Sequence, residues 1–498
     1  MTDRTKYKRA LALTAVLVAV SMLFTSCGII IINDNSGADV TTVSEDTTSS
    51  PDDTTSSEKI DKSPTLDYLK LAGDYVTAVP AYDFDGADIV ISGIGAEKFG
   101  GVNANEAGTI NSLNKSKRNK LVQDALNGKL VFTEPDVEGF YESLKEAVNS
   151  GEKFSDLLIV PQQVVGELAL AGLLYDVSEL DCNYQEPYFD FNAMQSSGGN
   201  VLYAVIGDAT KDPDYLYGVY FNKTLVTGAG LDLPYKLVES GEWTFDRFLE
   251  YMDTVSASEL GIEDLAIHAF VDVNYADILF EGAGFSMITS VFGEAPVITE
   301  PTEEAESFME KLKNLFETNP KWAGDSPETK FADGEMLFYV SPLQRSNALS
   351  TAAADWGIVP MPKGSKEQQN YRTLADPDMP VVVVPKNITD KAETSSLVSA
   401  LFAASYKYLG TAYAENQMSY FLRDSESVNM VYRIINSAVY DGAYMFSSAY
   451  ATVSNATITS LRNAALGKST IRNYYDFYAS KADNSMKALK VSSKEQAS

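Results

Sequence analysis

Hydrophobic and polar positions follow two periodicities along most of this chain. Short apolar runs at residues 87–92, 157–160, 218–221, 336–340 and 381–384 have the length and the β-branched or aromatic content of buried strands. Between them, longer segments place apolar side chains at helical spacing, as in the stripe of Val137, Phe140, Leu144 and Val148. Strands and helices alternate, so the pattern predicts an α/β fold with largely parallel sheets.

The passage from residue 217 to residue 251 carries the clearest start and stop signals. An apolar strand ends at Asn222-Lys223, which opens a short helix, and a passage rich in glycine and proline follows. Thr244 suits an N-cap, because its hydroxyl can accept hydrogen bonds from the free amides of a first helical turn. The helix predicted after it has one apolar face, formed by Phe245, Phe248, Leu249, Met252 and Val255.

The N-terminus has the pattern of a bacterial lipoprotein signal peptide over residues 1–26. Basic residues precede an apolar stretch at 10–24 that is too short for a comfortable bilayer span. Phe24-Thr25-Ser26-Cys27 resembles a lipobox, although Phe24 stands where leucine is usual, so we expect cleavage before Cys27 and its acylation, as by palmitate. The alternative is an ordinary secretory signal with an incidental cysteine. Residues 27–63, rich in Ser, Thr and Asp, are expected to form a disordered tether.

The stock of chemically reactive side chains is small. His268 is the single histidine and lies in an apolar run typical of a packed residue, and Cys27 and Cys182 are the two cysteines. Neither a Cys/His zinc site nor a disulfide framework can be built from these residues. The 69 acidic residues against 39 basic ones give a net charge of −30, which repels nucleic acid. We therefore expect no metal, no cofactor and no nucleic-acid partner.

Three short motifs have structural explanations. Gly93-Ile94-Gly95 opens like a dinucleotide-binding loop, but Lys98 stands at the third glycine position. Residues 467–470 read Gly-Lys-Ser-Thr and lack the earlier glycine of a phosphate loop, so the glycine is predicted to cap a helix. The aspartates at positions 83, 85 and 88 lack the further ligands of a calcium loop.

Several motifs resemble the extracellular solute-binding proteins of bacterial ABC importers (family 1, carbohydrate type). They are Phe-Asn-Lys at 221–223, Gly-Leu-x-x-Pro at 230–234, Gly-x-Trp-Thr-Phe at 241–245 and Trp-Gly-x-x-Pro-x-Pro at 356–362. Arg-Asp-x-x-Ser at 423–427 resembles the loop that precedes the family's C-terminal helices. The resemblance covers roughly residues 80–480.

The resemblance implies a two-lobed periplasmic-binding-protein-like fold of type II. Each lobe would be a mostly parallel sheet flanked by helices, with a hinge between the lobes. We expect the first lobe to comprise residues 64–203 and 379–424, and the second to comprise residues 204–378 and 425–490.

Sugar binding requires aromatic rings for the apolar faces of the sugar and polar groups for its hydroxyls. Ligands of open α/β sheets bind at the carboxyl ends of strands, so candidates are sought just after strands and in loops between lobes. Trp243 and Trp356 lie inside motifs and are expected to pack in the core. The residues expected to contact a ligand are Asp208, Asn274, Tyr275, Asp277, Phe285, Trp322, Ser341, Gln344, Arg345, Asp376, Asp378 and Tyr444.

Together these features predict a lipid-anchored, monomeric substrate-binding protein on the extracellular face of a bacterial cell membrane. It would capture a carbohydrate, expected to be an oligosaccharide, and deliver it to ABC permease subunits without chemistry on the ligand. The alternatives are a surface glycoside hydrolase and a sugar-sensing or adhesion lipoprotein without a transport role. Within the binding class, peptides and other polar solutes stay open.

Overall fold

The computed structural model describes residues 82–104, 109–258, 260, 269–270, 272–318, 326–409 and 421–495. The predicted signal peptide, Cys27, the tether, His268 and Trp322 lie outside these residues. Within the described part of the chain, no helix combines the length and apolar character that a membrane crossing requires.

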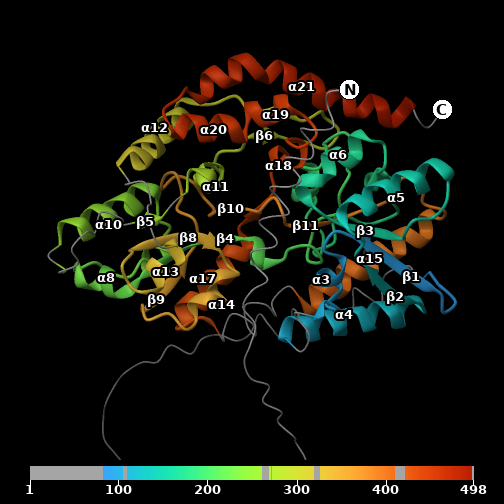
Figure 1. Cartoon of the computed structure of the whole chain (residues 1–498), viewed down its shortest axis with the longest axis horizontal. Coiled ribbons are helices and arrows are strands. Elements are labelled where there is room, and N and C mark those ends of the chain that lie inside the picture. The colour runs from blue at the N-terminus through green and yellow to red at the C-terminus, as the bar shows by residue number, and fades with distance from the viewer. Residues whose placement is uncertain are drawn as a thin grey trace, which may run out of the picture. The chain divides into compact units, whose positions relative to one another are not determined.

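The first sheet has four strands in the order β11-β3-β1-β2 (Figure 1). β1 (Asp88–Gly93) pairs in parallel with β2 (Lys129–Thr133) and with β3 (Leu157–Pro161). β11 (Pro380–Val383) joins β3 in antiparallel register, and its three valines are fully buried, as its uninterrupted apolar run predicts. The helices of this region are α3 (Ala96–Gly100), α4 (Ile110–Leu126), α5 (Val137–Ser150), α6 (Val165–Leu170), α7 (Phe191–Gln195) and α15 (Lys391–Tyr408).

The second sheet has the strand order β5-β8-β4-β9. β5 (Ala269–Phe270) runs parallel to β8 (Phe338–Pro342), but β4 (Tyr217–Asn222) is antiparallel to both β8 and β9 (Trp356–Val359). The expectation of a mostly parallel sheet therefore fails here. The cause is the route of the chain, because β4 begins beside the carboxyl end of β8, where Tyr217 pairs with Pro342.

Helices with clear caps flank the second sheet. α10 (Phe245–Ala257) starts at Thr244, whose hydroxyl accepts from the amide of Arg247 at 3.4 Å, so the predicted N-cap is confirmed. Trp243 and Trp356 are fully buried, and each indole N–H donates to a backbone carbonyl, as their expected packing role requires. The remaining helices here are α8 (Lys223–Gly228), α9 (Tyr235–Glu239), α13 (Pro327–Ala332), α14 (Arg345–Leu349) and α17 (Ser425–Asn436).

The chain passes between the two sheets along two segments that lie side by side. Leu216, just before β4, forms an antiparallel bridge with Ala375, in the segment that leads to β11. β11 starts where β3 ends, since Pro380 pairs with Pro161. β4 likewise starts where β8 ends, since Tyr217 pairs with Pro342. Both passages thus lie at the carboxyl ends of β3 and β8, the edge at which α/β proteins place their ligands.

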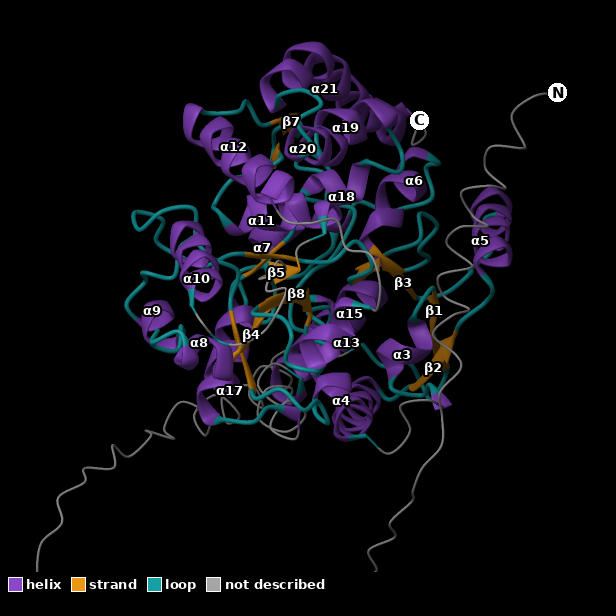
Figure 2. Ribbon diagram, turned by 60° about the vertical axis from the view of Figure 1, so that its left-hand side comes forward, coloured by secondary structure: helices purple, strands orange, loops and turns teal. Residues whose placement is uncertain are grey.

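The C-terminal part adds two short strand pairs and a group of helices (Figure 2). β10 (Thr373–Leu374) pairs with β12 (Ala438–Val439), and β6 (Ile288–Thr289) pairs with β7 (Val297–Ile298). α18 (Gly442–Phe446) contacts α6 of the first region, and Gly166 of α6 lies so close that a Cβ there would stand 2.3 Å from the Met445 carbonyl oxygen. The other helices are α11 (Ala276–Gly282), α12 (Glu303–Thr318), α19 (Ala451–Ala456), α20 (Ile458–Ala465) and α21 (Ile471–Glu495).

Candidate functional site

Tyrosine and aspartate side chains gather next to the passage between the sheets. Tyr217 is the first residue of β4, and its hydroxyl donates to the carboxylate of Asp376 in the neighbouring segment. The ring of Tyr275 lies edge-on to that of Tyr217, with centroids 5.3 Å apart. Tyr444 of α18 donates to Asp277 Oδ2 of α11 at 3.0 Å. We call these five residues the Tyr/Asp cluster, and four of them (Tyr275, Asp277, Asp376 and Tyr444) are among the residues predicted from sequence.

Burial controls the ionisation of the cluster. Asp277 is fully buried, and loss of hydration raises its pKa from 3.8 to about 6, although Arg462 at 3.6 Å and the Tyr444 hydroxyl oppose the rise. Desolvation also raises the pKa of Tyr275 to about 12 and that of Tyr217 and Tyr444 further still. All three phenols therefore keep their protons near neutral pH, so the cluster offers neutral hydroxyl groups.

Two glutamines directly after β3 donate hydrogen bonds to the segment between the sheets that contains residues 375–378. The side-chain amide of Gln162 donates to the carbonyls of Ala375 at 3.0 Å and Asp376 at 2.7 Å, while Gln163 donates to Asp378 Oδ1 at 2.5 Å. Burial, and then the charge of Asp376, raises the pKa of Asp378. The sequence reasoning missed Gln162 and Gln163. Their position directly after a buried strand was the available signal.

Asp208 lies on the side of the first sheet. Val205 forms a bridge with Val382 of β11, so the chain reaches Asp208 near the start of that strand. The residue is half-buried, yet its Oδ2 is buried and has no hydrogen-bond partner among the described residues. Desolvation raises its pKa to about 7, against the opposing charge of Lys211. Asp208 is therefore a carboxyl group poised to accept or donate a hydrogen bond to an incoming polar group.

The remaining predicted residues have other surroundings. Ser341 is buried in β8 opposite Gly218, one position from the partner of Tyr217. Asn274 is exposed, and its carbonyl accepts from Arg462 at 3.2 Å. Gln344 and Arg345 are exposed at the start of α14, where Arg345 pairs with Glu328 at 3.4 Å.

Phe285 lies in a separate aromatic group. Its ring centroid is 5.1 Å from that of Phe280 and 5.7 Å from that of Phe308. It also lines a cavity that contains none of the other predicted residues. The structure therefore does not bring Phe285 together with the Tyr/Asp cluster.

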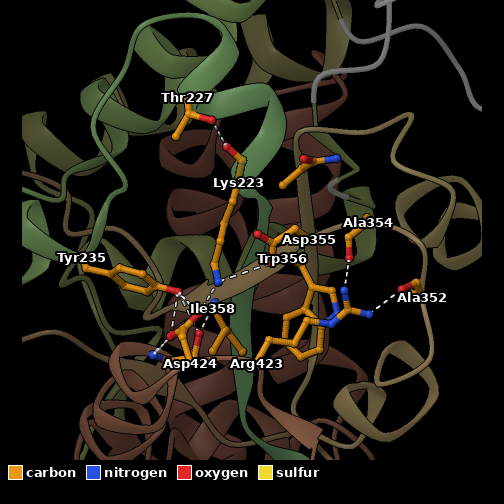
Figure 3. A network of polar contacts seen from close by, with 12 residues as sticks. Lys223, Thr227, Tyr235, Ala352, Ala354, Asp355, Trp356, Ile358, Arg423 and Asp424 are labelled. Atoms are coloured by element: carbon orange, nitrogen blue, oxygen red, sulfur yellow. Dashed lines mark hydrogen bonds and ion pairs between the residues drawn. The ribbon is translucent and has the colours of Figure 1, made fainter.

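The sequence motifs meet at the opposite end of β4 (Figure 3). Lys223 pairs with Asp424 and, at 3.5 Å, with Asp355, while the Tyr235 hydroxyl donates to Asp424 at 3.0 Å. Arg423 donates to the carbonyl of Ala354 at 2.6 Å, with its guanidinium over the ring of Trp356. These contacts join three separate motifs, those at 221–223, 356–362 and 423–427, at the end of the sheet remote from Tyr217. The motifs therefore build the scaffold and leave the candidate site to other residues.

The solved structures of two sugar-binding proteins have a similar fold. One is a cyclo/maltodextrin-binding protein complexed with maltotetraose, with 16% identity, a TM-score of 0.53, and coverage of 80% of this chain and 96% of that chain. Another is the cyclic alpha-maltosyl-1,6-maltose binding protein from Arthrobacter globiformis, with 14% identity, a TM-score of 0.55, and coverage of 81% of this chain and 99% of that chain. No protein-family model matches the chain, and no curated sequence is significantly similar to it. The α/β fold expected from sequence is thus confirmed, and the chain is similar in fold to these binding proteins over nearly their whole length.

Proposed function

We propose that this protein binds an oligosaccharide at the Tyr/Asp cluster and serves as the substrate-binding component of an ABC importer. The observation that carries the proposal is the convergence of Tyr217, Tyr275, Asp277, Asp376 and Tyr444 at the carboxyl ends of the strands. Aromatic rings can pack on sugar faces, and hydroxyl and carboxyl groups can bond to sugar hydroxyls. The similar fold of two oligosaccharide-binding proteins supports this ligand class.

The proposed mechanism uses two lobes, each containing one of the four-stranded sheets. The sequence predicts residues 64–203 with 379–424 for one lobe and residues 204–378 with 425–490 for the other. The bridge of Val205 to Val382 of β11 supports moving the first boundary toward Leu216, and the ion pair of Lys223 with Asp424 supports assigning residue 424 to the second lobe. A ligand that contacts both lobes favours the closed arrangement by the free energy of contacts that exist only there. The segments bridged at Leu216 and Ala375 would then act as the hinge.

Delivery to a permease and attachment through Cys27 complete the proposal. The lipobox-like sequence and the polar tether that follows it support a monomeric lipoprotein on the extracellular face of the membrane. Mass spectrometry of the membrane fraction should find a diacylglyceryl group on Cys27, and light scattering of the protein without residues 1–27 should give a monomer mass. An unmodified N-terminal segment or a stable dimer would contradict these parts.

Titration calorimetry against linear and cyclic maltodextrins tests the ligand assignment. Wild type should bind at least one member, and Tyr275→Ala should weaken that binding by about 10-fold or more, as loss of an aromatic contact and its buried area predicts. Tyr478→Ala on α21 is the matched control and should bind like wild type. If no carbohydrate binds while a peptide or another polar solute does, the proposed ligand class is wrong.

A surface glycoside hydrolase is the second candidate, and one feature favours it. Asp277 has a pKa raised to about 6, a range in which a carboxyl can act as general acid. Its full burial and its contacts with Tyr444 and Arg462 suit a carboxyl that positions the other groups of the cluster, not one that protonates a substrate, so we favour binding without chemistry. Release of shorter sugars from a polysaccharide by the purified protein would reverse this preference.

A further inference from the structure

A cavity of about 340 Å³ lies among the C-terminal helices. Its wall comes from the loop after α11, from β6, from the segment before α12, and from α20 and α21. Phe285, Thr289, Thr299, Thr457, Ser460 and Tyr475 are among the residues that line it. None of the five residues of the Tyr/Asp cluster does so, which makes the cavity a separate feature of the molecule.

Ser460 on α20 gives this cavity a hydrogen-bonding group. Its side chain lines the cavity and is 2% exposed. A hydroxyl in a cavity wall can donate to and accept from a ligand that fills the space. Thr457 lies beside it and donates to the Val453 carbonyl at 2.7 Å, which leaves the oxygen of Thr457 able to accept.

The other lining residues have matching chemistry. Phe285 and Tyr475 contribute aromatic surface, and Thr289 and Thr299 contribute hydroxyls that lie 2.9 Å apart. Among the described lining residues, Glu300 alone is charged, and Arg472 pairs with it at 2.8 Å. The site therefore presents aromatic carbon and neutral hydroxyl groups, with no uncompensated charge to favour an ionic ligand.

We propose that this cavity is a second binding site, which takes one neutral sugar ring. A pyranose has an apolar face for the aromatic wall and hydroxyls for Ser460 and Thr457. The volume stands at the lower end of the range of about 300–1,000 Å³ typical of small-molecule sites, so it suits a single ring and excludes an oligosaccharide. The proposal does not depend on what the Tyr/Asp cluster binds.

Saturation-transfer NMR with D-glucose as the probe tests the site on the full chain without its signal peptide. Wild type should give a glucose signal that Ser460→Leu abolishes, because the larger side chain fills the space beside α20. Ser460→Ala, which removes only the hydroxyl, should weaken binding about 2- to 10-fold, the effect of one hydrogen bond. Urea denaturation of each variant establishes that it is folded. If Ser460→Leu does not fold, Ser460→Ala alone provides the test.

The variant Tyr275→Ala separates the two sites. It should leave the glucose signal unchanged, whereas Ser460→Leu should leave maltodextrin binding unchanged. Absence of a glucose signal at millimolar concentration in wild type overturns the second site. So does a signal that survives both Ser460 substitutions, or one that disappears in Tyr275→Ala, since glucose would then bind elsewhere.

Discussion

Replacing Asp277 by asparagine should remove a pH-dependent loss of stability. The carboxyl is fully buried on α11, accepts from Tyr444 at 3.0 Å, and has Arg462 at 3.6 Å. Asparagine has nearly the same shape and can still accept the tyrosine hydrogen bond, but it has no charge to bury. Asp277→Asn therefore isolates the cost of ionising this one group in the folded protein.

The magnitude follows from the raised pKa. A rise from 3.8 to about 6, caused mainly by desolvation, corresponds to about 3 kcal/mol. Because the folded-state pKa is the higher one, the protonated carboxyl provides this stability below pH 3.8, and the stability is lost as the pH rises through 6. At pH 5 residue 277 is already ionised in the unfolded chain, so about half of this stability is lost by pH 5. About 1.5 kcal/mol of it remains to be lost between pH 5 and pH 8.

Urea denaturation of wild type and Asp277→Asn at pH 5 and pH 8 measures the effect. The free energy of unfolding of the variant, relative to wild type, should increase by about 1.5 kcal/mol between the two pH values. Asp253→Asn, at an exposed position on α10, removes the same net charge and serves as the control. The reasoning is refuted if wild type gains stability relative to Asp277→Asn at pH 8, because the Arg462 ion pair would then outweigh desolvation.

Four further substitutions test the scaffold and the anchor. Trp243→Ala should lower the free energy of unfolding by about 3–5 kcal/mol in urea titration, because it empties a fully buried site, and a loss below about 1 kcal/mol would contradict that role. Gly93→Ala should reduce the melting temperature strongly, since Gly93 has φ of +132° and a Cβ would stand 2.1 Å from the Ile159 carbonyl oxygen. Gly86→Ala should lower the melting temperature less, because Gly86 also has a positive φ but a Cβ there would meet no atom within 4 Å. Cys27→Ser should move the protein from the membrane fraction to the medium on immunoblots, and continued membrane retention would argue against lipidation.

Local sequence was sufficient to place much of the secondary structure. The valine run of β11, the N-cap at Thr244 and the burial of Trp243 and Trp356 depend on neighbouring residues and on side-chain type, so they are readable without coordinates. Tyr275, Asp277, Asp376 and Tyr444 could also be predicted as polar or aromatic residues just after strands or in loops between the lobes.

Tertiary structure alone decided which of those residues meet. Tyr217 begins a strand that the sequence marks as scaffold, yet it contacts Asp376, a residue 159 positions away. Because β4 runs antiparallel to β8 and β9, Tyr217 lies at the end of the strand where it meets Asp376. The same direction places Lys223 and its partner Asp424 at the other end of the strand. Strand direction and long-range register depend on how the chain travels between the two sheets. That route is a property of the whole fold, because the periodicity of a strand is the same whichever way the strand runs.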